Sequence, residues 1–263
     1  MNQQHLRGRA ALVTGAGSGN GAAIARRLRR DGAEVWLLDR DSDGLERTLA
    51  GWDEDDRSGA TPVVADITID AEVEDAIGGL ERLDVLVNNA GVVDPGSFPE
   101  LGIEAFSRVL DVNLLGAYRC CVAANELLCT SRCGRVVNVT SMEAHHLLST
   151  GGKVQPHYNA SKAGLDLLTK ALAYEFARSG VTVNAIAPGV IETAFTKGML
   201  EREEISSWVE GCVPLGRVGQ PDDIAAVASF LASDDAGYVN GVSIAVDGGF
   251  TLGWFRQGSG DAG

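Results

Sequence analysis

The sequence has no long apolar run and few basic residues, and both shortages exclude classes of protein. No apolar stretch is long enough to span a bilayer, and the first residues, MNQQHLRGRA, hold no apolar signal core. We therefore expect a cytoplasmic protein with no membrane partner. Lys and Arg total 22 against 36 Asp and Glu, for a formal net charge of −14. Because nucleic-acid binding needs a basic face, this charge argues against a nucleic-acid partner.

Cysteine is also scarce, and its pattern argues against both a disulfide framework and a metal centre. The five residues are an odd set: Cys120, Cys121, Cys129, Cys133 and Cys212. Cys129 and Cys133 have a spacing that suits a metal, but no second His or Cys pair follows at zinc-site distance. We predict free thiols, no structural disulfide and no bound metal.

Short apolar segments alternate with amphipathic helical patterns along most of the chain. The predicted strands are residues 10–13, 34–40, 61–66, 84–87, 134–141, 181–187 and 243–247. The predicted helices are residues 22–30, 45–50, 70–82, 104–128 and 158–177, with one more that starts at Gln220. This alternation predicts an α/β fold, a parallel sheet with helices on both faces. We expect residues 1–253 to form one domain, with a loop bearing short helical pieces at 190–213, and residues 254–263 to be a flexible tail.

A glycine-rich turn joins the first predicted strand to the first predicted helix. Its sequence, from Thr14 to Gly21, is TGAGSGNG. Glycines there let the backbone approach a pyrophosphate, which the positive helix N-terminus stabilises. Because glycines also mark ordinary turns, it is the position between strand and helix that indicates a dinucleotide site.

The second predicted strand ends in an acid, Asp39, which lies 18 residues after Gly21. A dinucleotide-binding unit places a carboxylate near this position to accept from the adenine ribose, and it would repel a 2′-phosphate. The pattern therefore favours NAD over NADP. Arg40 is the counter-argument because guanidinium groups bind phosphates, and we expect Asp39 to hold it. The alternative for Asp39 is a solvated acid at a strand end.

Tyr158 and Lys162 are four residues apart in a predicted helix, and therefore on one face. The phenol has an ordinary pKa of about 10, and a fixed cation beside it favours the phenolate. The pair is thus a candidate proton acceptor near neutral pH. Taken alone, the same spacing also fits a half-buried ring beside a solvated amine.

Eight motifs stand in order from about Gly8 to Gly249, and together they carry a family resemblance. They are TGAGSGNG (14–21), DIT (66–68), NNAG (88–91), VNLLG (112–116), Ser141, YNASK (158–162), APG (187–189) and VDGG (246–249). With them the chain resembles a short-chain dehydrogenase/reductase of the single-domain type. The resemblance implies a single-domain Rossmann fold, a doubly wound parallel sheet of about seven strands.

The resemblance also implies an activity, hydride transfer between a nicotinamide and a secondary alcohol or ketone that is small, cyclic or a polyol. By resemblance, Tyr158 is the general acid/base, and Lys162 lowers its pKa and binds the nicotinamide ribose. Ser141 orients the substrate oxygen, and Asn113 distorts its helix and holds a water of a proton relay. The resemblance further implies a homotetramer that packs its long helices across two-fold axes.

A set of cofactor contacts comes with the same resemblance, and we expect the cofactor to be NAD. The residues are Gly15, Ser18, Gly19, Asn20, Gly21, Asp39, Asp66, Ile67, Asn88, Ala90, Gly91, Tyr158, Lys162, Pro188, Gly189, Ile191 and Thr193. Asn88 and Ala90 are expected to line the cofactor channel, and Thr193 to bind the carboxamide.

Two departures from the family pattern bear on the substrate. Asn20 stands where the family usually has an apolar residue. Ser141 and Tyr158 are 17 positions apart, which is longer than the usual spacing. The added loop makes His145, His146 and Gln155 candidates for substrate contact. Further candidate regions for specificity are 190–213 and, in the tail, Trp254 and Phe255.

Two other functions compete with this one. A 3-oxoacyl-thioester reductase would use NADPH and need a basic patch for its carrier protein, and both Asp39 and the acidic balance argue against it. A catalytically silent NAD-binding regulator would have no need for all of Asn113, Ser141, Tyr158 and Lys162. A halide-eliminating branch of the fold has Arg in place of Lys and lacks the glycine loop, so Lys162 excludes it.

Overall fold

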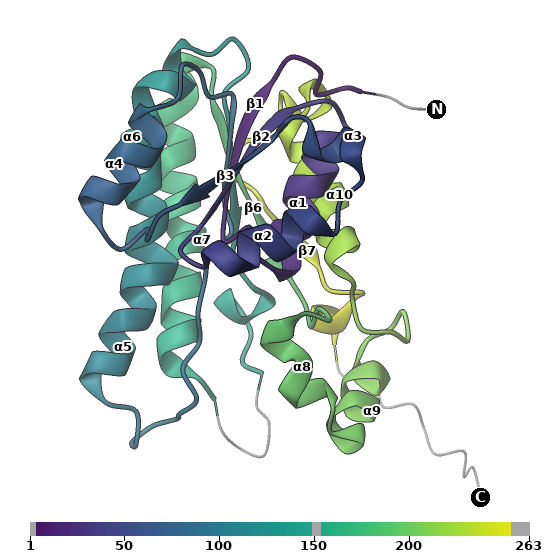
Figure 1. The fold of residues 1–263 in the computed structure, drawn as a ribbon. Helices are drawn as coiled ribbons and strands as arrows, with labels where there is room; N and C mark the ends of the chain where they lie inside the picture. The colour runs from purple at the N-terminus through teal and green to yellow at the C-terminus, as the bar shows by residue number, and fades with distance from the viewer. Residues whose placement is uncertain (1–3, 149–153, 254–263) are drawn as a thin grey trace, which may run out of the picture.

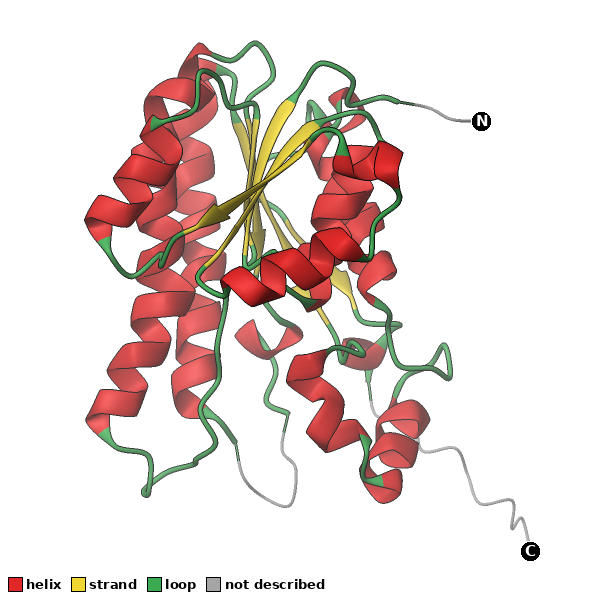
Figure 2. Cartoon of the chain, viewed as in Figure 1, coloured by secondary structure: helices red, strands yellow, loops and turns green. Residues whose placement is uncertain are grey.

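The structure is a computed structural model that describes residues 4–148 and 154–253. Within these residues, seven strands form one parallel sheet in the order β3-β2-β1-β4-β5-β6-β7 (Figures 1 and 2). The strands are β1 (Ala10–Thr14), β2 (Glu34–Asp39), β3 (Ala60–Val64), β4 (Val85–Asn88), β5 (Arg135–Val139), β6 (Thr182–Pro188) and β7 (Ser243–Val246). The predicted Rossmann fold is confirmed. The predicted tail, residues 254–263, lies outside the described residues.

Helices cover both faces of the sheet (Figure 2). On one face lie α1 (Gly19–Arg30), α2 (Ser42–Ala50) and α10 (Pro221–Ala232). On the other lie α4 (Asp70–Gly78), α6 (Ala117–Thr130) and α7 (Pro156–Phe176). The remaining α-helices of the described chain are α3 (Glu54–Arg57), α5 (Ile103–Leu110), α8 (Ala194–Leu200) and α9 (Glu203–Cys212).

Each central strand supplies two hydrophobic cores. Val13 and Leu37 pack under α1 and α10, whereas their neighbours Leu12 and Leu38 pack under α4 and α6. Successive strand side chains point to opposite faces, so a strand buried on both sides is apolar throughout. This requirement explains why the strand patterns are continuous apolar runs.

The strand order reverses direction at β1, which pairs with β2 on one side and β4 on the other. The chain therefore leaves the carboxyl ends of β1 and β4 in opposite directions, and a crevice opens between their following loops. The glycine loop after Thr14 and the turn after Asn88 border this crevice.

The helix expected at 104–128 is interrupted. It consists of α5, a π-helical turn at Asp111–Gly116, and α6. The distortion that the resemblance implies at Asn113 therefore takes the form of one widened turn. Residues 190–213, expected to be a loop with short helical pieces, contain α8 and α9.

No described helix combines the length and apolar character that a bilayer crossing requires. All five cysteines are free thiols, and Cys120 and Cys121 are buried. Their burial raises the pKa of each thiol to about 12. The described residues hold no cluster of three or more His, Cys, Asp or Glu able to bind a metal ion.

Candidate active site

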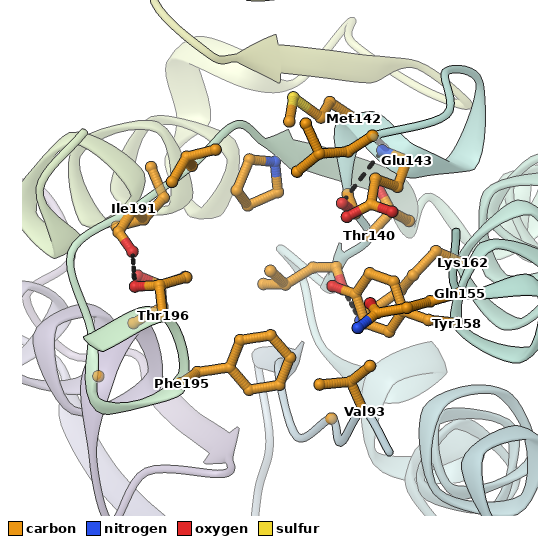
Figure 3. A pocket seen from close by; sticks show the side chains of 18 of the residues that line it. Val93, Thr140, Met142, Glu143, Gln155, Tyr158, Lys162, Ile191, Phe195 and Thr196 are labelled. Carbon is orange, nitrogen blue, oxygen red and sulfur yellow. Dashed lines mark hydrogen bonds between the residues drawn. The ribbon is translucent and has the colours of Figure 1, made fainter. Parts of the chain in front are cut away.

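A cavity of about 620 Å³ lies beyond the carboxyl ends of the strands. Its walls come from the glycine loop, the ends of β5 and β6, the start of α7, and α8. Figure 3 shows Tyr158, Lys162 and Gln155 on one side, with Ile191, Phe195 and Thr196 facing them across the cavity. A smaller cavity of about 150 Å³ shares Gly15, Asp39 and Gly91 with it.

Most residues assigned to the cofactor from the sequence line one of these cavities. The larger one is lined by Gly15, Ser18, Gly19, Asn20, Asp39, Gly91, Tyr158, Lys162, Pro188, Gly189 and Ile191. The smaller one is lined by Gly15, Asp39, Asp66, Ile67, Ala90 and Gly91. Thr193 caps α8 and its side chain faces Gly19.

The glycine loop fits a dinucleotide pyrophosphate. Gly15 has φ +66°, and a Cβ on it would lie 2.7 Å from the Ala90 Cα. A Cβ on Gly21 would lie 2.1 Å from the Gly15 carbonyl oxygen. These two positions therefore accept only glycine, and the backbone of the loop lies at the cavity wall. Helix α1 begins at Gly19 with no acid in its first turn, so its positive end is free to face an anion.

Asn20 adds a polar group to this loop. Its Oδ1 atom is buried and has no hydrogen-bond partner among the described residues, and Asn20 lines the cavity. Buried polar atoms are normally paired, so an orphaned one at the wall of a cavity fits a ligand with a donor. The departure from the family pattern thus falls at a place that a nicotinamide cofactor can reach.

The acid at the end of β2 is fixed by backbone groups. Asp39 Oδ2 accepts from the Gly17 amide at 2.9 Å, and Oδ1 accepts from the Asp41 amide at 3.0 Å. The expectation that Asp39 holds Arg40 needs correction. Arg40 instead pairs with Asp66, at 3.6 Å, because β3 ends beside β2 and the two strand-end loops meet there.

Asn88 does not line either cavity, which corrects a second expectation. It is 3% exposed, and its Nδ2 donates to Asn138 Oδ1 at 2.9 Å and to Cys121 Sγ at 3.4 Å. As a member of β4 it points between the strand and α6. Gly21 likewise lines neither cavity; it allows α1 to pack against the Gly15 backbone.

Ser141, Tyr158 and Lys162 meet at one wall of the larger cavity. Ser141 follows β5, and its Oγ accepts from the Glu143 amide at 3.1 Å. Lys162 is 3% exposed, its Nζ donates to the Val139 carbonyl at 2.9 Å, and Nζ lies 5.7 Å from the Tyr158 ring centroid. The structure therefore brings three of the four predicted catalytic residues together at the cavity (Figure 3 labels Tyr158 and Lys162).

Asn113 lies behind this wall rather than in it. Its side chain accepts from the Val92 amide at 2.8 Å and donates to the Val92 carbonyl at 2.9 Å and to Ser161 Oγ at 3.0 Å. Asn113 Oδ1 and Lys162 Nζ each lie 3.4 Å from the position of a Cβ on Gly91. Asn113 thus joins the loop after β4 to α7 next to the Lys162 amine.

The electrostatics of Tyr158 differ from the expectation based on sequence. Burial of the ring and the nearby Glu143 carboxylate raise the pKa of Tyr158 above its ordinary value, and a hydrogen bond with Ser141 lowers it. Burial lowers the pKa of Lys162 to about 8. The expected lowering of the Tyr158 pKa by Lys162 is not found, because the amine is directed at the Val139 carbonyl and the ring is desolvated.

Sequence reasoning missed Glu143, an acid two residues after Ser141. It lines the cavity, and its burial raises its pKa to about 7, against a lowering by the hydrogen bond from Asn159. The available signal was an acid just after a strand-end serine that was already a candidate. Nothing in the local sequence indicated that this acid would be partly buried.

Of the three residues predicted to contact the substrate, the structure places one at the cavity and two outside it. Gln155 lines the cavity. His145 and His146 are exposed and lie outside it, and His145 Nε2 is 3.4 Å from Asp166 Oδ1. This acid on α7 holds His145 away from the site, so the described structure does not place either histidine at a substrate. The middle of the loop, residues 149–153, and the candidates Trp254 and Phe255 lie outside the described residues.

Comparison with known proteins bears on the family. A family model described as enoyl-(acyl carrier protein) reductase matches residues 15–251. A short-chain type dehydrogenase/reductase from Mycobacterium marinum superposes with a TM-score of 0.87 at 31% identity, over 96% of this chain and 99% of that one. The chain belongs to the short-chain dehydrogenase/reductase family.

Relatives within the short-chain dehydrogenase/reductase family are named for different substrates. A 3β-hydroxysteroid dehydrogenase of Eggerthella lenta is 38% identical, over 94% of this chain and 95% of its own length. A 3-oxoacyl-[acyl-carrier-protein] reductase of Rickettsia bellii is 36% identical, over 94% and 98%. A galactitol 2-dehydrogenase of Cereibacter sphaeroides is 38% identical, over 94% and 96%.

Two of the similar solved structures are described with bound NADP, one of them at low occupancy. The structure without that qualification is described as a 2-deoxy-D-gluconate 3-dehydrogenase of Agrobacterium tumefaciens. It has a TM-score of 0.83 at 36% identity and covers 96% of this chain and 100% of its own. Members of the short-chain dehydrogenase/reductase family bind a nicotinamide cofactor and act on alcohol and ketone groups, and this chain is such an oxidoreductase.

Proposed function

We propose that the chain is an NAD-dependent dehydrogenase that acts on a small secondary alcohol, a cyclic alcohol or a polyol, or on the corresponding ketone. The observation that carries the proposal is that Ser141, Tyr158 and Lys162 line one cavity together with the glycine loop. The relatives named for galactitol and hydroxysteroid oxidation support an alcohol substrate.

The proposed chemistry divides among these side chains. A bound nicotinamide supplies the hydride acceptor for oxidation or the donor for reduction. Ser141 Oγ binds the substrate oxygen, and Tyr158 takes up the carbinol proton in oxidation and returns it in reduction. Because its pKa is raised in this structure, Tyr158 is protonated at neutral pH, the state that donates to a developing alkoxide. Oxidation needs additional positive charge beside the ring to favour the phenolate.

We propose that Lys162 and Asn113 assist proton transfer between Tyr158 and solvent. Lys162 is buried with a pKa of about 8, so its amine can change protonation state close to neutral pH. Asn113 borders the same space around Gly91. We infer that the proton exchanges between Tyr158 and solvent past Lys162 and a water held near Asn113.

The preference for NAD is proposed from Asp39. Its carboxylate borders both cavities and is held rigidly by two backbone amides, which suits it to accept from ribose hydroxyls. The opposing consideration is that two structural relatives are described with bound NADP. Arg40 is paired with Asp66, which makes it less available to a 2′-phosphate.

A screen tests the proposed function directly. The purified protein is supplied with NAD and with secondary alcohols, cyclic alcohols and polyols, and NADH absorbance is followed. We expect NADH to form with at least one of these classes. Failure with all of them, while NADH still binds, would contradict the proposal.

The competing function is reduction of a 3-oxoacyl thioester with NADPH. It is favoured by the relative from Rickettsia bellii and by the description of the family model. The net charge of −14 opposes it, because a carrier protein is recognised by a basic patch. Oxidation of NADPH by acetoacetyl thioesters, with no turnover of NAD and alcohols, would establish this alternative.

A further inference from the structure

Glu143 is the one acid of the larger cavity that lies beside the proposed catalytic residues, and the proposed chemistry does not use it. It belongs to a short 3₁₀ helix, Met142–Ala144, that follows β5. The Ser141 hydroxyl caps this helix by accepting from the Glu143 amide at 3.1 Å. Ser141, the group proposed to bind the reacting oxygen, and the Glu143 carboxylate are therefore held in one turn.

The carboxylate of Glu143 is anchored on one side only. Asn159 Nδ2 donates to both the Glu143 carbonyl and Glu143 Oε2, each at 3.1 Å. The other carboxylate oxygen, Oε1, has no hydrogen bond to any residue that the structure describes. An ionised carboxylate has four acceptor sites, and the bond from Asn159 uses only one of them. The anchored side chain therefore offers an acceptor to whatever occupies the cavity.

Much of the cavity that this acceptor lines is apolar. Met142, Leu148 and Val190 line the cavity, and Phe195 and Met199 line the wall formed by α8. A substrate hydroxyl that faced these side chains would lose its hydrogen bonds to water without replacement. A hydroxyl that faced Glu143 would find an acceptor in a region of low dielectric, where the hydrogen bond is strong.

We propose that Glu143 is a specificity-determining residue whose carboxylate accepts a hydrogen bond from a donor on the carbon next to the reacting carbinol. The donor is a hydroxyl in a vicinal diol or polyol, or an ammonium in an amino alcohol. The neighbouring carbon is assigned because Ser141, which binds the reacting oxygen, is two residues from Glu143 in the same turn. This inference rests on the proposed dehydrogenase function.

The test compares substrates that differ by one donor. The pairs are 2-butanol with 2,3-butanediol and cyclohexanol with trans-cyclohexane-1,2-diol, and 3-amino-2-butanol supplies the ammonium. The full-length wild type, Glu143→Gln and Glu143→Leu are assayed with saturating NAD. Glu81→Gln is the matched control, because Glu81 is an exposed acid before β4, outside both cavities.

We expect the ratio of kcat/KM for diol over mono-alcohol to fall by at least about tenfold in Glu143→Gln, and further in Glu143→Leu. The loss should appear mainly in KM, whereas Glu81→Gln should keep the wild-type ratio. A fall confined to the amino alcohol would identify the donor as an ammonium. Glu143→Gln is nearly isosteric and keeps one acceptor for Asn159, so it carries the test if Glu143→Leu does not fold.

Two outcomes overturn the inference, and they are distinguishable. If the alcohols are oxidised but the ratios are the same in wild type and both variants, Glu143 does not select the substrate and the dehydrogenase function stands. If no alcohol in the panel is oxidised while NADH binding is normal by fluorescence, the proposed function itself fails and the inference fails with it.

Discussion

Tyr158 and Glu143 line the same cavity, and the Glu143 carboxylate makes ionisation of Tyr158 less favourable. The Glu143 carboxylate raises the pKa of Tyr158, after the larger effect of burial. Burial alone accounts for the raised pKa of Glu143, about 7. An ammonium donor that pairs with Glu143 would offset the charge of the carboxylate and therefore also favour the phenolate of Tyr158, so binding of an amino alcohol and activation of the base would be coupled.

Tyr158→Phe should abolish turnover and leave cofactor binding intact. Loss of a general acid/base typically costs about 10²–10⁴ in rate. The rate is measured by NADH absorbance and the binding by NADH fluorescence. Tyr174→Phe on the exposed side of α7 is the control and should keep full activity. Activity retained by Tyr158→Phe would refute the assignment of this residue.

Glu143→Gln should stabilise the protein, and more so as the pH rises. The pKa of Glu143 is 4.5 when unperturbed and about 7 in the folded state. Between these values the folded protein binds a proton that the unfolded chain releases, so the free energy of unfolding of the wild type falls with rising pH. The penalty is complete above the folded pKa, and Gln does not titrate.

The measurement is the difference in unfolding temperature between Glu143→Gln and the wild type at two pH values. We expect the advantage of the variant to grow by roughly 2–6 °C between about pH 5.5 and pH 7.5. Tyr158 stays protonated and Lys162 mostly charged across this range, so they do not obscure the comparison. A difference that does not change with pH would show that Glu143 is ionised normally.

Asp39 should give NAD a kcat/KM at least about tenfold above that of NADP, a discrimination of roughly 1.4 kcal/mol. Asp39→Ser should narrow this ratio because it removes the charge that repels a 2′-phosphate. Asp43→Ser, which changes an exposed acid in the first turn of α2, is the control. A wild-type preference for NADP would contradict the role given to Asp39.

At the scale of single residues, the sequence predicted the positions of the motif residues well, but it predicted poorly which side chains those residues contact. Ser141, Tyr158 and Lys162 could be placed because a strand end and a helical spacing determine where their side chains go. The partner of Arg40 and the burial of Glu143 could not, because both depend on elements distant in the chain: the end of β3 for one and Asn159 of α7 for the other.

At the scale of elements, the π-helical turn at Asp111–Gly116 is the main departure from the predicted secondary structure. The apolar periodicity of 104–128 indicates a continuous helix. The Asn113 side chain pairs with both backbone groups of Val92 and with Ser161, and these contacts lie outside the helix. The contacts of Asn113 with Val92 and Ser161 accompany the change from α-helical to π-helical geometry. The apolar periodicity of the sequence does not reveal such tertiary contacts.

The junction of β1 and α1 yields a further prediction. Gly21→Ala should lower the unfolding temperature and weaken NADH binding, because the added Cβ would lie 2.1 Å from a backbone oxygen of Gly15 and the loop would have to shift. Gly78→Ala is the control, since a Cβ at Gly78 meets nothing within 4 Å. Thermal unfolding and NADH fluorescence measure the two effects. Unchanged NADH affinity in Gly21→Ala would show that the loop tolerates the shift.

At the scale of the molecule, the helical face opposite α1 and α10 carries exposed apolar side chains. Tyr118 and Val122 on α6 and Leu167 and Tyr174 on α7 are among them, and Tyr174 is 81% exposed. Both helices pack on the same face of the sheet. Side chains of this kind gathered on one face are typical of an interface between subunits.

We therefore predict a homotetramer, with this face as one of its interfaces. Light scattering should give about four times the mass of one chain. Leu167→Lys should yield a smaller species, because it buries a charge in the interface. Leu147→Lys is the control, because Leu147 is also apolar and exposed but belongs to neither α6 nor α7. A monomeric mass for the wild type would refute the prediction.

The two sides of the cavity are attached to the molecule in different ways. Tyr158, Lys162 and the anchor of Glu143 stand on α7, which packs along the central sheet, whereas Phe195 and Met199 stand on α8, which contacts α9 and a small separate cluster. Phe195 is the exception on α8, because its ring centroid lies 6.2 Å from that of Tyr158. Substitutions at Met199 can therefore reshape the room for a substrate without touching the ring proposed to transfer the proton. A directed search for new substrates should begin at Met199, and leave Phe195 and α7 unchanged.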